Sequence, residues 1–264
     1  MTTYHKLSAQ YDALYRTHLE AFKERLAHTY CDYTKYTDFY PSIGVQSGKP
    51  VEFILYGQSV GGWQREHDYQ ERVPEDRVAK SNDYSNDRYA DHSPLDWVNV
   101  LRAKRNLAEL DEAGREFYKP FGHYNPGKSP FWQLIMGVIR EKYGIEQSSW
   151  SWTDNLVWSN LYKIAPQDGK CYNPDEGERI LQRPECVGLV EQELRELRPK
   201  YCIVYTNDAW WAPFRKGLRT ELLKAPAEGH VQRVERWEET KIIVVKRARV
   251  GSRAAVDHVL EYLD

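Results

Sequence analysis

The chain has 264 residues, of which 41% are hydrophobic and 29% are charged. This balance is ordinary for globular proteins and excludes a wholly disordered chain. Its 37 Lys and Arg residues against 39 Asp and Glu residues give a net charge of −2, which excludes a uniformly basic surface but not local basic patches. No apolar run approaches the roughly 20 residues that cross a membrane, so we expect no membrane partner.

The cysteines favour a reducing compartment. They are scattered without a close pair, whereas zinc and iron–sulfur sites usually contain one, so we expect neither a metal nor a cofactor. The N-terminal residues alternate charged and apolar positions and resemble no secretory signal. We therefore expect a cytoplasmic protein with free thiols and a single domain over 1–264. The cysteines are Cys31, Cys171, Cys186 and Cys202.

The N-terminal part of the chain predicts helix followed by strand. Residues 5–38 carry apolar side chains at three- and four-residue steps, which predicts one or two amphipathic helices within an N-terminal helical segment, 1–45. Residues 51–56 form a short apolar run that Gly57 ends, which predicts a buried strand followed by a glycine-rich turn.

From Ser129 onward the pattern alternates between helix and strand. Ser129 is a plausible N-cap, and Pro130 stands at the first helical position. Such alternation implies parallel crossovers, and therefore a three-layer α/β/α sandwich around a mostly parallel four-stranded sheet. In chain order we expect a helix at 130–144, a strand at 156–164, a helix near 187–197, a strand at 201–205, a helix from about 209, a strand at 241–245 and a helix at 253–263.

Ligands of such sheets bind at the carboxyl ends of the strands. The first strand ends in Gly57-Gln58-Ser59, the second in Asn160, and the last leads into the basic segment 246–253. An asparagine carboxamide can pair with the edge of a base, and cations before a helix suit phosphates. Each feature also has a purely structural alternative. The Gly57 turn could be a strained turn without a ligand, Asn160 could cap a loop, and 246–253 could be a solvated basic turn.

The order of these pieces resembles the uracil-DNA glycosylase superfamily. Gly57-Gln58 matches the family's turn that holds the water-activating group, 128–131 resembles its backbone-gripping loop, and 156–160 resembles its strand ending in a base-reading Asn. The segment 247–252 occupies the place of its minor-groove loop. Ser59 departs from the Asp that follows Gly-Gln in the best-known group, and arginines replace the His of the last loop.

The resemblance implies a monofunctional DNA N-glycosylase that flips out and excises a modified or damaged base, leaving an abasic site. One expected substrate is a bulky hypermodified cytosine of phage DNA, which would make the protein part of anti-phage defence. The alternative is a nucleic-acid or nucleotide binding module that has lost catalysis, which the missing Asp and His favour. We expect a monomer with DNA as its partner.

The expected site residues fall into three groups. The catalytic group is Gln58, Ser59, Glu66 and Asp68. The base-binding group is Gly57, Trp63 and Asn160. The DNA-binding group is Ser129, Lys246, Arg247, Arg249, Ser252 and Arg253.

Residues 64–128 are polar and are expected to form an insertion between two of these motifs, with one helix at about 94–117. A segment in this place passes over or beside the pocket, where its tyrosines offer stacking faces and its Asn and Asp side chains offer hydrogen-bonding groups for a hydroxyl-rich adduct. The alternative is a solvated decoration. The residues in question are Tyr84, Tyr89, Tyr118, Tyr124, Asn82, Asp83, Asn86 and Asp91.

Overall fold

The computed structural model describes the chain in ten stretches, and only the backbone of residues 67 and 68. The stretches are 3–28, 35–59, 67–68, 73–87, 93–103, 112, 124–166, 173–248, 251 and 253–263. The helices are α1 (Ala9–Ala27), α2 (Arg77–Asn82), α3 (Asp96–Arg102), α5 (Pro130–Tyr143), α6 (Glu176–Leu197), α7 (Asp208–Leu218) and α8 (Arg253–Leu260). The strands are β1 (Lys35–Asp38), β2 (Ser42–Ile43), β3 (Phe53–Gly57), β4 (His67–Asp68), β5 (Leu156–Asn160), β6 (Ile164–Pro166), β7 (Tyr201–Tyr205), β8 (Glu221–Lys224), β9 (Val231–Trp237) and β10 (Thr240–Val245).

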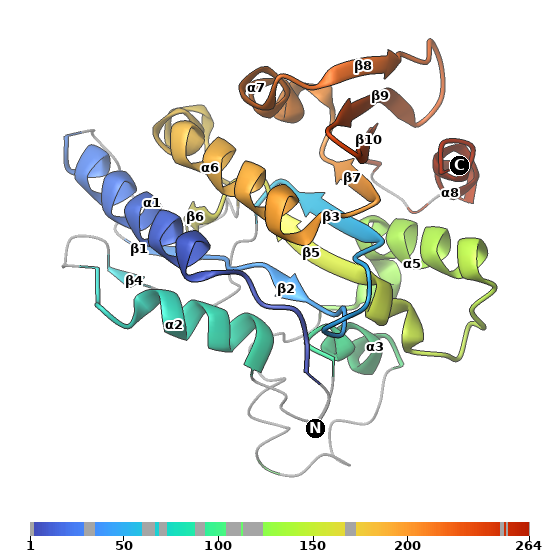
Figure 1. The fold of residues 1–264 in the computed structure, drawn as a ribbon, viewed down its shortest axis with the longest axis horizontal. Coiled ribbons are helices and arrows are strands. Elements are labelled where there is room, and N and C mark those ends of the chain that lie inside the picture. The colour runs from blue at the N-terminus through green and yellow to red at the C-terminus, as the bar shows by residue number, and fades with distance from the viewer. Residues whose placement is uncertain are drawn as a thin grey trace.

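The main sheet has the strand order β2-β5-β3-β7-β10-β9-β8 (Figure 1). Its middle strands β5, β3, β7 and β10 are parallel, as expected from the alternation of strands and helices. The expected total of four strands is wrong, because β2, β9 and β8 extend this sheet to seven by antiparallel pairing. A smaller sheet has the order β4-β1-β6.

Helices cover both faces of the main sheet, which gives the three layers. The strands β3, β5 and β7 are buried along their whole length, as parallel strands inside α/β proteins are. Ile54 and Tyr56 pack with α1, α6 and α7, whereas Phe53 and Leu55 pack with α3, α5 and α8. Figure 1 shows α1 and α6 side by side on the first of these faces.

A helix and a strand end earlier than the sequence predicts. The helix expected over 5–38 ends at Ala27 as α1, and 35–38 is the strand β1 because its backbone pairs with β6 and β4. The strand expected over 156–164 ends at Asn160, where the chain leaves the main sheet before β6 begins.

The helix expected near 187–197 begins earlier, at Glu176. Asp175 caps it, because its side chain accepts from the Glu178 N–H while the Glu178 carboxylate accepts from the Asp175 N–H. The helix also contains Pro184, a residue that usually argues against a helix interior. Its buried stripe returns every three or four residues, at Cys186, Leu189, Val190, Glu193, Leu194 and Leu197.

The described part of segment 64–128 contributes to the core. Leu95, Trp97, Val98 and Val100 are buried beside α5. The helix expected at about 94–117 is described as α3, and 104–111 and 113–123 lie outside the described residues.

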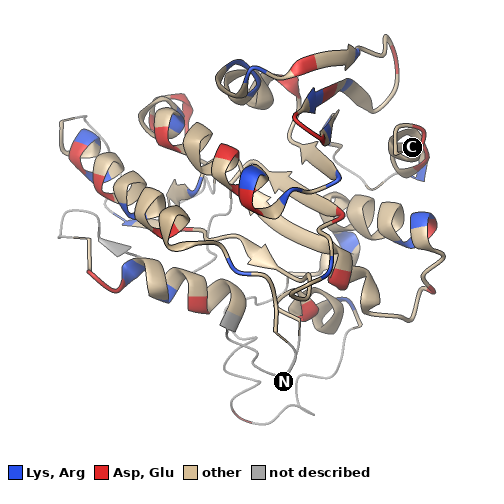
Figure 2. Ribbon diagram, in the orientation of Figure 1, with Lys and Arg blue, Asp and Glu red and all other residues tan. Residues whose placement is uncertain are grey.

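Basic and acidic residues are interspersed along the helices and the β8–β9 hairpin, as the coloured ribbon of Figure 2 shows. Among the described residues, no helix has the length and apolarity that crossing a bilayer requires.

Candidate functional site

A cavity of about 410 Å³ lies where the carboxyl ends of β7 and β10 meet the first turn of α5. This is the edge at which ligands of α/β sheets bind. Pro130 begins α5 at its first position, so the chain enters the helix beside this edge. The lining residues are Ser129, Pro130, Phe131, Tyr205, Asn207, Arg247 and Ala248.

Asn160 stands at the end of β5, directly opposite Gly57 of β3 in the parallel register. Its side chain is 2% exposed, and its Nδ2 has no hydrogen-bond partner among the described residues. Leaving a buried donor unpaired costs about 1–3 kcal/mol, so such a group calls for an explanation. The carboxamide lies against Gly57, where a side chain at residue 57 would overlap its Oδ1.

Phe131 connects the carboxamide with the cavity. Its ring lines the cavity and also lies over Gly57, where an added Cβ would come within 3.3 Å of its Cε2. The ring is 6.1 Å from that of Tyr205 and 6.3 Å from that of Trp158, measured between centroids. Sequence reasoning assigned Phe131 only to a backbone-gripping loop, whereas the ring is an apolar surface at the cavity. The Ser-Pro-Phe start of α5 was the available signal.

The Gln58 side chain links the ends of β3, β7 and β10 by hydrogen bonds. Its Nε2 donates to the Thr206 carbonyl at 3.3 Å, and its Oε1 accepts from the Arg247 guanidinium. The side chain is 9% exposed. In this arrangement both amide atoms of Gln58 have a protein partner, and its carbonyl oxygen holds the arginine at the cavity.

Tyr205 and Asn207 hold the segment that follows β10. The Tyr205 hydroxyl accepts from the Ala248 N–H at 2.9 Å, and Asn207 Oδ1 accepts from the Arg247 N–H at 2.7 Å. Burial raises the pKa of Tyr205, against the opposing effects of its bond to Ala248 and the nearby Arg247. Asn207 has φ 99° and ψ 155°, a conformation that is strained for a residue with a side chain.

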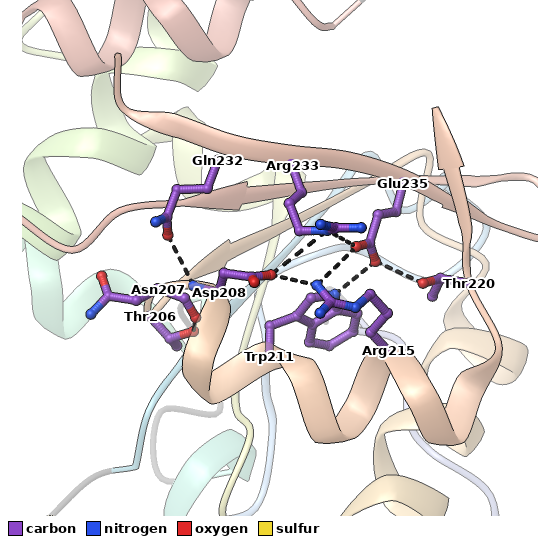
Figure 3. Close-up of polar contacts among 9 residues, drawn as sticks. All are labelled: Thr206, Asn207, Asp208, Trp211, Arg215, Thr220, Gln232, Arg233 and Glu235. Atoms are coloured by element: carbon purple, nitrogen blue, oxygen red, sulfur yellow. Dashed lines mark hydrogen bonds and ion pairs between the residues drawn. The ribbon is translucent and has the colours of Figure 1, made fainter. Parts of the chain in front are cut away.

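A polar cluster beside α7 keeps this strained turn in place (Figure 3). Glu235 is fully buried and accepts from Trp211 Nε1 at 2.9 Å, Thr220 Oγ1 at 2.7 Å and Arg233 Nε at 2.7 Å. Arg215 bridges this carboxylate and that of Asp208, the residue after Asn207. The cluster therefore anchors the start of α7, and with it one wall of the cavity.

Of the remaining expected site residues, some line the cavity or a neighbouring groove, and others are bonded to protein side chains. Ser129 lines the cavity. Ser59 donates to Asn173 Oδ1 at 3.0 Å. Lys246 is exposed and lines a neighbouring groove beside Asp208. Arg253 is neutralised by Glu141 at 2.6 Å and Asp257 at 2.8 Å, which makes it a poor phosphate ligand.

Several expected residues lie outside the described residues, and for Asp68 only the backbone, in β4, is described. Their proposed roles stay predictions. They are Trp63, Glu66, Arg249, Ser252, Tyr89, Tyr118 and Asp91.

The described amides of the 64–128 segment serve the fold. Asn86 Oδ1 accepts from the Ile43 N–H at 2.8 Å, and its Nδ2 donates to the Pro41 carbonyl and to Asn82 Oδ1, both at 2.9 Å. These bonds hold residues 83–87 against β2. Tyr84 packs against the core, and Tyr124 is 44% exposed, 6.5 Å from Trp97 between ring centroids.

The described lining of the cavity contains a cation but no carboxylate. Among the described residues there is also no group of three or more His, Cys, Asp or Glu side chains placed to hold a metal ion. Comparison of the chain with protein-family models and with curated proteins found no match.

Proposed function

We propose that this protein is a DNA N-glycosylase that reads a flipped-out base with Asn160. The observation that carries the proposal is the buried carboxamide at the ligand-binding edge of the sheet, with its Nδ2 unpaired among the described residues. A carboxamide offers a donor and an acceptor side by side, which matches the edge of a base. The resemblance of the motif order to the uracil-DNA glycosylase superfamily supports the same assignment.

The cavity provides an aromatic ring and a cation that such a reaction can use. A base that leaves the DNA stack can stack on the Phe131 ring, and it reaches Asn160 once that ring turns away from Gly57. In hydrolysis the oxygen of a water bonds to the sugar carbon and gives a proton to a carboxylate, while the N-glycosyl bond breaks and its electron pair leaves with the base, which then takes up a proton. The Arg247 guanidinium stabilises this anion or an adjacent phosphate.

We propose that a carboxylate from the residues after the Gly57 turn orients and activates the attacking water. Glu66 and Asp68 remain the candidates. A bulky hypermodified cytosine of phage DNA remains the proposed substrate. The cavity of about 410 Å³ has space for a base with an adduct once the Phe131 ring moves.

The test compares excision from oligonucleotides and phage DNAs that carry different bases, with alkaline cleavage to expose abasic sites. Asn160→Asp replaces a donor by an acceptor and should reduce discrimination between bases by about 1–3 kcal/mol. Asn155→Asp is the matched control, because Asn155 bonds only to the Ser151 carbonyl on the described structure, at 3.3 Å. Wild-type excision rates and base preference in Asn160→Asp would refute the assignment.

The second candidate is a binding module of the same architecture, and the absence of a carboxylate from the described lining favours it. The two candidates differ in one result. A binding module retains affinity for base-bearing oligonucleotides and produces no abasic sites at any protein concentration, and its affinity still falls in Asn160→Asp.

A further inference from the structure

A buried ion pair lies behind Asn160, on the opposite face of the sheet from the cavity. Lys163 Nζ is 2.6 Å from Glu193 Oε1, and both side chains are fully buried. Removing two charges from water costs several kcal/mol per ion, so such a pair persists only where its remaining hydrogen-bonding capacity is satisfied. Glu193 comes from the middle of the buried stripe of α6, where an apolar residue would otherwise pack.

Every donor of the ammonium has an acceptor. Besides Glu193, Lys163 Nζ donates to Ser159 Oγ and to the Asn160 carbonyl oxygen, both at 2.7 Å. An ammonium has three donors, and these three contacts use all of them. The carboxylate in turn accepts from Tyr11 at 2.7 Å and from Tyr56 at 2.8 Å, so the network ties α1, β3 and α6 to the end of β5.

The contact with the Asn160 carbonyl occurs where β5 ends. The pairing of β5 with β3 stops at Gly57 and Asn160, after which the chain bends toward β6. The Asn160 carbonyl takes its hydrogen bond from the ammonium at this bend. The carboxamide of the same residue is joined to this backbone by only two rotatable bonds, so the position of the backbone determines where the carboxamide lies.

We infer that Lys163 and Glu193 are positioning residues, which hold the Asn160 carboxamide against Gly57, next to the Phe131 ring that lines the cavity, by fixing its backbone from the other face of the sheet. The consequence for base reading rests on the proposed function, whereas the placement of the carboxamide does not. A charged pair suits this task because its contacts are directional, whereas apolar packing would leave the carbonyl without a partner.

The test uses NMR of the side-chain amides in ¹⁵N-labelled protein, with the Asn160 signals assigned by their absence from Asn160→Asp. The variant Lys163→Met/Glu193→Gln removes both charges and keeps an acceptor for the tyrosines. We expect the Asn160 signals to shift or broaden in it, while those of Asn99, a carboxamide buried elsewhere, stay unchanged. Tyr11→Phe is the matched control, because it removes one bond to Glu193 and none to Asn160.

Excision kinetics provide the second readout. A displaced recognition group lowers kcat by about 10- to 100-fold in the double variant, while the affinity for undamaged DNA stays at the wild-type value. Unchanged Asn160 signals in the double variant overturn the inference. A wild-type protein that excises no base overturns the proposed function instead, and the NMR result still decides the positioning. If the double variant does not fold, Lys163→Met alone, which removes the donor to the Asn160 carbonyl and keeps both tyrosine bonds of Glu193, is measured by the same criteria.

Discussion

The substitution Gly57→Ala tests the close packing between β3 and the Asn160 carboxamide. A Cβ on residue 57 would overlap Asn160 Oδ1 and come within 3.3 Å of Phe131 Cε2. Gly57 does not have a positive φ, so alanine suits its backbone and the conflict is confined to these two side chains. We therefore expect the carboxamide to turn away from its position against Gly57.

Two effects of opposite sign determine the stability of this variant. Overpacking a buried site costs about 1–3 kcal/mol. Replacing glycine by alanine in a compatible conformation stabilises the folded state by about 0.4–1 kcal/mol, because the unfolded chain loses conformational entropy. The net loss is then between about 0 and 2.6 kcal/mol, and we expect the protein to stay folded. Base discrimination should fall as far as in Asn160→Asp, by about 1–3 kcal/mol, because the same group is displaced.

Urea unfolding and the excision assay together measure these two quantities. Gly188→Ala is the matched control: Gly188 lies inside α6, and a Cβ there has nothing within 4 Å. This control should gain about 0.5–1 kcal/mol of stability and keep wild-type excision. Wild-type base preference in Gly57→Ala would show that the carboxamide does not read the base from this position.

Three further predictions follow from charge and burial. On duplex DNA, Lys246→Gln should reduce the slope of log affinity against log salt by about 0.9, because Lys246 is exposed with no ion pair on the described structure, whereas the paired Arg253→Gln should leave it unchanged. Equal slopes in the two variants would contradict this. Burial, with the nearby Lys163 and Arg25, lowers the pKa of His18 to about 3. The unfolded chain therefore binds the proton more tightly, and the stabilisation present above pH 6.5 is lost as pH falls toward 3. In urea titrations the wild type should lose about 2 kcal/mol more than His18→Leu between pH 7 and pH 5, and parallel curves would exclude this linkage. Burial also raises the pKa of the Cys186 thiol to about 12, so peptide mapping after iodoacetamide treatment at pH 8 should find Cys186 unlabelled in the native protein and labelled in urea.

Local patterns in the sequence predicted much of the scaffold. The apolar runs ending at Gly57, Tyr205 and Val245 are strands because fully buried parallel strands need apolar side chains on both faces. Pro130 and Gly144 marked the ends of α5, since proline suits the first turn and Gly144 takes the left-handed conformation with φ 61°. These features depend on neighbours in the chain, which a sequence displays directly.

The β8–β9 hairpin was missed because its strands carry many charges. Arg233, Glu235 and Arg236 interrupt the apolar alternation of β9, so its sequence does not read as a strand. In the structure Glu235 is buried and its carboxylate is satisfied by Trp211 and Thr220, which are distant in sequence. Long-range partners of this kind override the local preference.

The sequence by itself determined the four parallel strands of the main sheet, the positions of Gly57 and Asn160 at two strand ends, and the basic segment after the last strand. Only the tertiary structure decided what these residues do to one another. Gln58 is occupied by Arg247, Arg253 is neutralised by Glu141, and Lys163 meets Glu193 behind Asn160. The physical reason is one of range. Periodicity and turn chemistry act over a few residues along the chain. Whether a buried charge or donor finds a partner depends on which distant groups the sheet brings within about 3 Å.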